Sequence, residues 1–241
     1  MITFIIGFIA GVAVAVALTL LFFQKKKLHT EVEILKEQMK DLSVYLDGLP
    51  SVPKEKRKKI VIEGLRAEGE KAVGEYKWAE AIDYFQKALT LATGKDKGVI
   101  LQRLGWCYYF TGDLSQALRN LQESLEQARL IKDSQGEAAN LGNIGTIYQA
   151  KGDLDQALKY HQESLKIKKE IGYKQGEANS LNNLAAVYQQ KGDLDKTLKC
   201  LEQALKIFEE IGMPEEIGIV KENIKRISQQ MKQMKAKAND G

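Results

Sequence analysis

The sequence predicts an all-α protein: a superhelical solenoid of four helix-turn-helix units and a C-terminal capping helix, preceded by a transmembrane helix and a short coiled-coil helix. Three observations lead to this fold class. Residues 136–175 and 176–215 are identical at 20 of 40 aligned positions, and two degenerate copies precede them. Within each copy, apolar residues recur at intervals of three and four, as along one face of a helix. A run of 22 residues without a charge, Ile2–Phe23, stands before the repeats.

Self-similarity at a fixed period is typical of stacked units, because each unit needs a neighbour to bury its apolar face. We expect one array over residues 59–213. Each unit holds two amphipathic helices around a short Gly-Asp turn, with Asp113, Asp153 and Asp193 as helix N-caps. Asp113 and Asp153 are each followed three residues later by Gln, which completes a capping-box pattern. The four expected units cover residues 59–94, 97–132, 137–172 and 177–212.

The array is expected to end in a capping helix over residues 214–235. Pro214 suits the first turn of a helix, where its missing N–H needs no partner. Ile217, Val220 and Ile224 begin an apolar spacing of three and four that continues to Met234. Such a helix covers the apolar face that the last unit would otherwise expose. We expect residues 236–241 to be a disordered tail.

These residues make the chain resemble the tetratricopeptide repeat (TPR) family, whose units carry apolar residues, a tyrosine, a Gly-Asp turn and an alanine at fixed offsets. The period of forty exceeds the usual family period of about 34 and is similar to the long-helix repeats of kinesin light chain and of spindle-orientation adaptors. In the first unit, Tyr76 stands in place of the turn glycine. The resemblance implies that an extended peptide binds in a concave groove. The third unit matches through Leu141, Ile144, Gly145, Tyr148, Gly152, Asp153 and Ala157.

The N-terminal segment, residues 1–24, is predicted to be a transmembrane helix. As a helix, its 22 uncharged residues 2–23 span about 33 Å, enough to cross a bilayer core. A cleaved signal peptide is the alternative. We favour an uncleaved anchor for two reasons. No Lys or Arg precedes the span, and the one stretch of small residues that could serve as a cleavage site is followed by further apolar residues. Lys25, Lys26 and Lys27 follow at once, so the positive-inside rule predicts that the repeats lie in the cytoplasm.

Two patterns before the repeats predict a parallel homodimer. Gly7 and Gly11 form a GxxxG motif, which allows close helix approach in lipid. Residues 28–49 carry a heptad seam of apolar residues typical of a coiled coil. The alternative is an amphipathic helix that packs on its own repeat domain. Residues 50–58 are expected to be a linker, whose basic part is either solvated or in contact with anionic head groups. The seam residues are Leu28, Val32, Leu35, Met39, Leu42, Leu46 and Leu49.

Candidate binding residues come from the sixth position of the first helix in each unit, which in this family usually points into the groove. Arg103, Asn143, Asn183 and, on the capping helix, Asn223 occupy it at intervals of forty. An Asn amide both donates and accepts, so a ladder of Asn can hold a peptide backbone. The alternative is a packing residue that repeat duplication has copied. Neighbouring candidates are Asn182 and, for apolar contacts, Trp106 and Tyr109.

No motif in the sequence indicates catalysis, a cofactor or a metal site. The chain contains neither a Gly-rich phosphate loop nor an HExxH motif, and His161 occupies a helix position where an aromatic residue normally packs. The net charge of +4 is dispersed, which disfavours nucleic acid as a partner. We therefore expect a membrane-anchored adaptor or scaffold that binds a protein or peptide. The alternatives are a chaperone-like assembly factor for membrane or secreted clients and a regulator of a partner enzyme.

Overall fold

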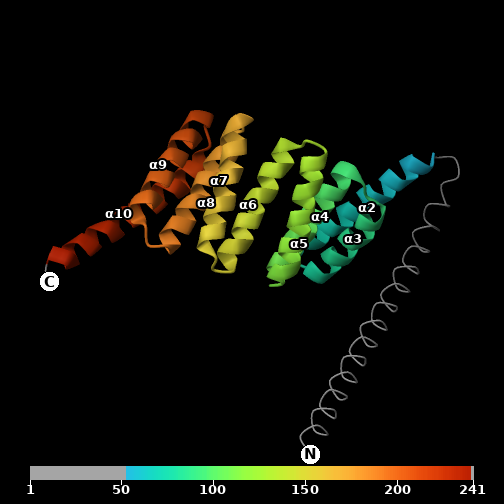
Figure 1. Ribbon diagram of the computed structural model, residues 1–241, viewed down its shortest axis with the longest axis horizontal. Helices are drawn as coiled ribbons and strands as arrows, with labels where there is room; N and C mark the ends of the chain where they lie inside the picture. The colour runs from blue at the N-terminus through green and yellow to red at the C-terminus, as the bar shows by residue number, and fades with distance from the viewer. Residues whose placement is uncertain (1–52, 240–241) are drawn as a thin grey trace, which may run out of the picture. The chain divides into compact units, whose positions relative to one another are not determined.

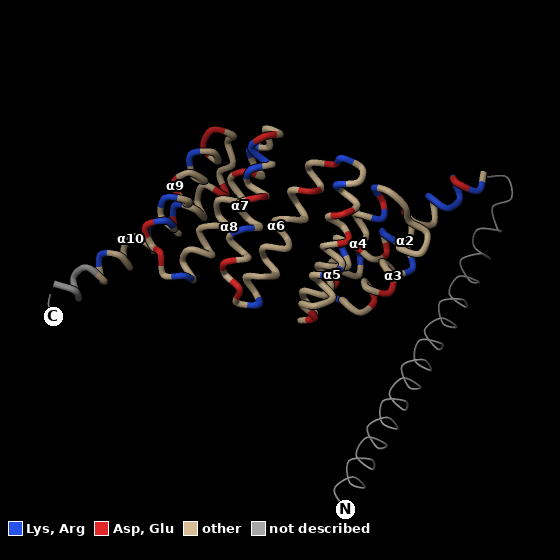
Figure 2. The backbone as a smooth tube through the Cα atoms, in the orientation of Figure 1, with Lys and Arg blue, Asp and Glu red and all other residues tan. Residues whose placement is uncertain are grey.

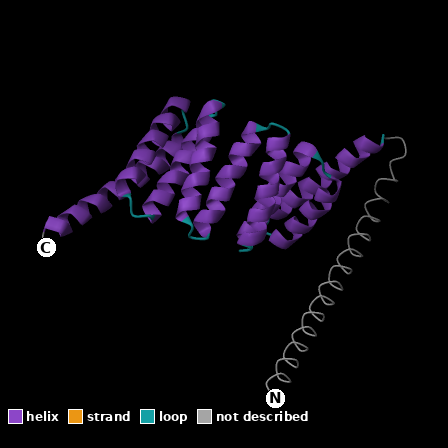
Figure 3. Ribbon diagram, in the orientation of Figure 1, coloured by secondary structure: helices purple, strands orange, loops and turns teal. Residues whose placement is uncertain are grey.

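The computed structural model describes residues 53–239, with side chains up to Met234, and over these residues the regular secondary structure is all helix (Figure 1, Figure 3). The chain divides into two compact units, Met1–Glu63 and Gly64–Gly241, and the second of these is the repeat domain. The helices are α2 (Lys54–Gly74), α3 (Trp78–Leu91), α4 (Gly94–Phe110), α5 (Leu114–Leu130), α6 (Ser134–Ala150), α7 (Leu154–Glu170), α8 (Lys174–Gln190), α9 (Leu194–Ile211) and α10 (Pro214–Asn239).

Two expected boundaries were wrong. Helix α2 begins at Lys54, so residues 54–58 of the expected linker are helical. Pro53 starts this helix, because its carbonyl accepts the backbone N–H of Arg57 at 3.0 Å. Helix α10 continues to Asn239, since nothing between Met234 and Asn239 is a glycine or proline that would end it. The expected disordered tail is therefore helical over residues 236–239.

The predicted transmembrane helix (1–24), coiled-coil helix (28–49) and remaining linker residues up to 52 lie outside the described part of the chain. The self-association candidates from Gly7 to Leu46 lie there too. Among the helices of residues 53–239, none combines the length and apolarity that crossing a membrane requires. Anchor and homodimer therefore stay predictions.

The helix pairs follow the repeat. Each first helix packs against the second helix of its own unit, and the second helix packs against the first helix of the next: α4 with α5, α5 with α6, and so on to α9 with α10. Connections between successive helices are short turns that gather at two opposite edges of the repeat domain (Figure 3). The capping helix α10 covers α9, where Val220 and Ile227 are fully buried beside Phe208. The expected solenoid with a terminal cap is confirmed.

The Gly-Asp turns form as predicted. The carboxylates of Asp113, Asp153 and Asp193 accept the backbone N–H three residues later at 2.9, 3.1 and 3.1 Å. In the fourth unit Lys196 replaces the glutamine, and its ammonium pairs with Asp193 at 2.7 Å. In the first unit Tyr76 takes the left-handed conformation of the missing glycine, with φ of 59°.

Close helix contact inside each unit depends on a small residue in the first helix. A Cβ added to Gly69 would lie 2.7 Å from Phe85, and a Cβ added to Gly105 would lie 2.6 Å from Leu121. The second residue of each pair comes sixteen residues later, on the second helix. The third pair is Gly145 and His161, and in the fourth unit Ala185 stands opposite Leu201. These pairs set how closely the two helices approach.

Candidate functional site

The predicted ladder residues lie in different environments. Arg103 donates from Nε to a carboxylate oxygen of Glu70 at 2.7 Å, and about half of its side chain is exposed. Its charge is therefore partly satisfied within the repeat domain. Asn143 is half-buried and Asn183 is exposed, and neither lines the cavity that Asn182 and Asn223 line. The structure thus separates these two asparagines from Asn182 and Asn223, which share one site.

Asn182 and Asn223 line a cavity of about 180 Å³ between α8, α9 and α10. The amide oxygen of Asn182 is buried and has no hydrogen-bond partner. Asn223 accepts a hydrogen bond at 3.3 Å from Nη2 of Arg226, whose guanidinium also borders the cavity. A cavity with an unpaired acceptor and a cationic donor can bind a group that both donates and accepts, such as a peptide bond. The remaining lining residues are Ala185, Ala186, Gln189, Thr197, Leu201 and Ile227.

Sequence reasoning missed Arg226. Arg226 stands three residues after Asn223 on α10, just as Trp106 stands three residues after Arg103 on α4. Residues three apart share one face of a helix, so this spacing could have identified it.

A second cavity, of about 300 Å³, lies where α4 ends beside the turn between α2 and α3. Trp78 stacks on Phe110 with 4.6 Å between ring centroids, and Trp106 meets Tyr109 edge-on at 5.5 Å. Tyr76 extends this group, with its ring 6.0 Å from that of Trp78. The cavity walls are mostly apolar, so the site suits a large apolar side chain. Its lining residues are Val73, Trp78, Arg103, Trp106, Cys107 and Phe110.

The structure thus brings three predicted residues, Arg103, Trp106 and Tyr109, into one aromatic group. Sequence reasoning missed Tyr76, Trp78 and Phe110. Trp106, Tyr109 and Phe110 are spaced as neighbours on one helix face, which could have identified Phe110. Tyr76 and Trp78 belong to the unit whose turn departs from the pattern. Burial raises the pKa of the Cys107 thiol to about 11, so this side chain is a neutral part of the wall.

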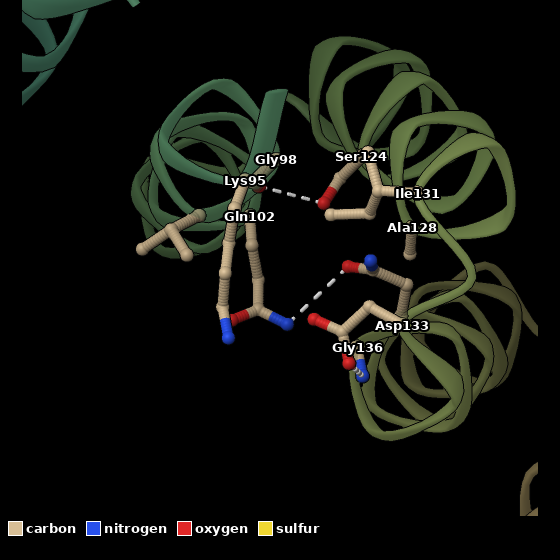
Figure 4. A pocket seen from close by; sticks show the side chains of 10 residues that line it. Lys95, Gly98, Gln102, Ser124, Ala128, Ile131, Asp133 and Gly136 are labelled. Carbon is tan, nitrogen blue, oxygen red and sulfur yellow. Dashed lines mark hydrogen bonds between the residues drawn. The ribbon is translucent and has the colours of Figure 1, made fainter. Parts of the chain in front are cut away.

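A smaller cavity of about 60 Å³ lies between α4, α5 and α6 (Figure 4). Gln102 donates from its side-chain amide to the amide oxygen of Asn140 at 3.3 Å, and Ser124 donates to the carbonyl of Gly98 at 2.7 Å (Figure 4). One unit later Lys168 replaces Ala128, and its ammonium donates to the hydroxyl of Ser180 at 2.8 Å. Burial lowers the pKa of Lys168. These polar groups pair with one another, which is the arrangement of a packing site.

His161 is fully buried between α6 and α7, and neither ring nitrogen has a hydrogen-bond partner. Burial, helped by the nearby charge of Lys168, lowers the pKa of His161 to about 4. The ring is therefore neutral near pH 7 and occupies the place of the expected aromatic side chain. Cys107 and Cys200 are both free thiols. In residues 53–234 no group of three His, Cys, Asp or Glu side chains could hold a metal ion.

A stack of helical hairpins closed by a capping helix defines a repeat solenoid, the class of protein that presents extended surfaces to other proteins. The chain belongs to the tetratricopeptide repeat family, whose model matches residues 76–130 and 136–210. Such arrays are typically interaction scaffolds and not enzymes. No curated protein sequence matches the chain.

Solved structures show the same fold. BtubC (BKLC) from P. vanneervenii is similar with a TM-score of 0.59 and 17% identity, over 82% of this chain and 92% of that protein. The nearly identical, kinesin light chain-type TPR-like repeats of Podosopora anserina match with a TM-score of 0.55 and 14% identity, over 75% and 97%. A Rap protein complexed with Competence and Sporulation Factor has a TM-score of 0.63 and 20% identity. That match covers 71% of this chain and 48% of the Rap protein.

Proposed function

We propose that this protein is a membrane-tethered TPR adaptor that holds an extended segment of a partner protein along its first helices. The observation that carries the proposal is the cavity between α8 and α10, where the buried amide oxygen of Asn182 has no partner. A bound peptide N–H would donate to this oxygen.

The polar groups around this cavity match a peptide backbone. Asn182 accepts a backbone N–H, and Arg226 donates to a backbone carbonyl or to an acidic side chain. Asn143 and Asn183 lie on the preceding first helices, at the same register as Asn223. In the proposed complex their amides continue the contact with the backbone, largely independently of the peptide sequence.

Specificity comes from the aromatic cavity. Its walls, formed by Trp78, Trp106 and Phe110, accept one large apolar side chain of the same peptide. Aromatic residues supply much of the binding energy at protein interfaces because they bury large areas with few rotatable bonds. Arg103, beside them, is paired with Glu70 and steers the peptide more weakly than a free cation would.

The tether is the second part of the proposal. Residues 2–23 have the length and apolarity of a membrane-spanning helix, and Lys25–Lys27 favour a cytoplasmic repeat domain. Gly7, Gly11 and the heptad seam from Leu28 to Leu49 would hold two chains parallel. Two binding sites held together at one membrane raise the effective concentration for a partner without any new contact.

A photo-crosslinking residue placed at Ala186 tests the binding site, because Ala186 is exposed and lines the cavity. We expect a crosslinked partner segment from the full chain in its membrane, and its loss in the pair Asn182→Ala with Arg226→Ala. Lys151, exposed in the turn before α7, is the matched position for a control crosslinker. Equal crosslinking by the double variant, with unchanged circular dichroism, would contradict the proposal.

A chaperone-like role is the second candidate, and the polar cavity between α8 and α10 favours it, because contacts from Asn182 and Arg226 to a peptide backbone do not depend on its side chains. It predicts that unrelated extended peptides compete equally well for the crosslink from Ala186. The adaptor predicts that only a narrow set of peptides competes.

A further inference from the structure

The third unit carries a lysine at a position where the units on either side of it have apolar residues. Lys168 on α7 stands forty residues after Ala128 on α5 and forty residues before Phe208 on α9. Ala128 is buried beside the small cavity that Figure 4 shows, and Phe208 is fully buried. The third unit therefore places a positive charge where its neighbours are neutral.

The local packing directs the side chain of Lys168 towards the first helices. Its ammonium donates to the hydroxyl of Ser180 on α8 at 2.8 Å. A Cβ added to Gly142 on α6 would lie 3.9 Å from the same nitrogen, and a Cβ added to Gly176 on α8 would lie 3.1 Å from Cδ of the lysine. These two glycines leave the space that the lysine side chain occupies between α6 and α8.

One unit earlier, a glutamine side chain occupies the corresponding space. Gln102 on α4 stands forty residues before Gly142. Its hydrogen-bond partner Asn140 stands forty residues before Ser180. Gln102 donates its side-chain amide to Asn140 at 3.3 Å, as Lys168 donates its ammonium to Ser180 (Figure 4). The ammonium from the second helix thus replaces a neutral amide of a first helix.

This place belongs to the surface to which we assign peptide binding. Forty residues after Gly142 stands Asn182, which lines the cavity between α8 and α10. Ser180 stands one turn before Asn183, and residues three apart share one face of a helix. The ammonium of Lys168 therefore lies on the surface formed by the first helices, next to the asparagines of α8.

The charge of Lys168 has no counter-ion in the described part of the chain. Its neighbour Lys169 pairs with Glu177 at 3.8 Å, whereas no carboxylate of residues 53–234 pairs with Lys168. The hydroxyl of Ser180 is neutral and accepts only one of the three N–H groups of the ammonium. Burial without a compensating carboxylate lowers the pKa of Lys168. The packing contact at Ser180 therefore leaves the charge itself unpaired.

The first helices on both sides of this ammonium are uncharged beyond their first turns. Residues 138–150 of α6 and 178–190 of α8 contain no Asp, Glu, Lys or Arg, so both stretches are tan in Figure 2. A partly buried charge in neutral surroundings is screened less than a charge in water. A carboxylate that reaches Lys168 would therefore pair with it more strongly than with an exposed lysine.

We propose that Lys168 selects partner segments that carry an acidic side chain, whose carboxylate accepts the N–H groups that Ser180 leaves free. The inference rests on the proposed peptide-binding function and specifies one side chain of that peptide. One ammonium matches the single charge of an Asp or Glu carboxylate, whereas a phosphate group carries nearly two charges and three acceptor oxygens. Along the first helices, this acidic side chain lies between the aromatic cavity at α4 and the polar cavity beside α10.

Selection of a random peptide display library on the full chain tests this pairing. We expect the selected peptides to share Asp or Glu at one position. Lys168→Met should weaken the binding of such a peptide about tenfold, and replacing the acidic residue of the peptide by its amide should then have no further effect. Lys168→Glu should prefer the peptide with Lys at that position, a reversal that a loss of packing would not produce.

Lys166→Glu is the matched control, because it makes the same change of charge on α7 at a lysine whose side chain is 78% exposed. It should leave the preference for an acidic residue unchanged. Circular dichroism checks the fold of each variant. Lys168→Met keeps the apolar stem of the lysine, so it tests the pairing even if Lys168→Glu does not fold.

The outcomes separate this pairing from the binding site as a whole. If the selected peptides lose affinity with Asn182→Ala but bind equally well with and without an acidic residue, the role of Lys168 is wrong and the binding site stands. If Lys166→Glu changes the charge preference as much as Lys168→Glu does, the pairing is also wrong. If no peptide binds the full chain, both proposals are overturned.

Discussion

Gly145 of α6 and the imidazole of His161 of α7 touch so closely that a Cβ on the glycine would lie 2.8 Å from the ring. The ring is fully buried, and its two nitrogens find no hydrogen-bond partner. The centre of the third unit is therefore packed by a polar ring at the position that Phe85 fills in the first unit. Because of this contact, the stability of the repeat domain should depend on the size of the side chain at position 145 and on the protonation of His161.

Acid should destabilise the protein through His161. Its pKa falls from 6.5 to about 4 on folding, so the unfolded chain binds the proton more readily. The stability that the neutral ring provides is complete above pH 6.5 and is lost as pH falls towards 4, by about 3 kcal/mol over that range. Urea unfolding at several pH values measures this loss of unfolding free energy. In the variant His161→Phe most of the pH dependence should disappear. An unchanged pH profile in that variant would show that other groups cause the acid sensitivity.

A methyl group at Gly145 should be costly. We expect Gly145→Ala to lower the free energy of unfolding by about 2 kcal/mol, because the His161 ring must move in a filled core. Gly218 of α10 is the matched control, since an added Cβ there meets no atom within 4 Å. Gly218→Ala should raise stability by about 0.5–1 kcal/mol through helix propensity. Urea denaturation compares the two variants, and equal effects would contradict the packing account.

Lys132 takes a left-handed conformation with φ of 57°, at the position where the next two units have Gly172 and Gly212. A side chain in this conformation costs about 1–2 kcal/mol relative to glycine. We therefore expect Lys132→Gly to raise the thermal midpoint and Gly172→Lys to lower it. A thermal unfolding series on the two single variants tests this, and a lower midpoint for Lys132→Gly would refute it.

Repeat patterns predicted the helix pairs and their caps because the period fixes which residues share a face and where each turn must come. They could not distinguish Asn182 from Asn183, since adjacent residues of a helix differ by about 100° and only the packing of α10 decides which one meets the cavity. Only some residues of the aromatic cavity were predicted. Trp78 of the first unit stacks on Phe110 of the second, and a pattern within one unit does not show contacts between units. The linker was placed too far along the chain because Pro53 begins a helix and does not break one.

The binding site of the adaptor is the central claim, and the affinity of the crosslinked partner peptide tests it most directly. Fluorescence anisotropy of the labelled peptide with the full chain would compare the unsubstituted protein, Asn182→Ala and the control Asn120→Ala. Asn120 lies on α5 and donates to the carbonyl of Gln116, away from the cavity. We predict that Asn182→Ala weakens binding about tenfold, the loss of one buried hydrogen bond, and that Asn120→Ala leaves the affinity unchanged. Equal affinities for all three proteins would contradict the account.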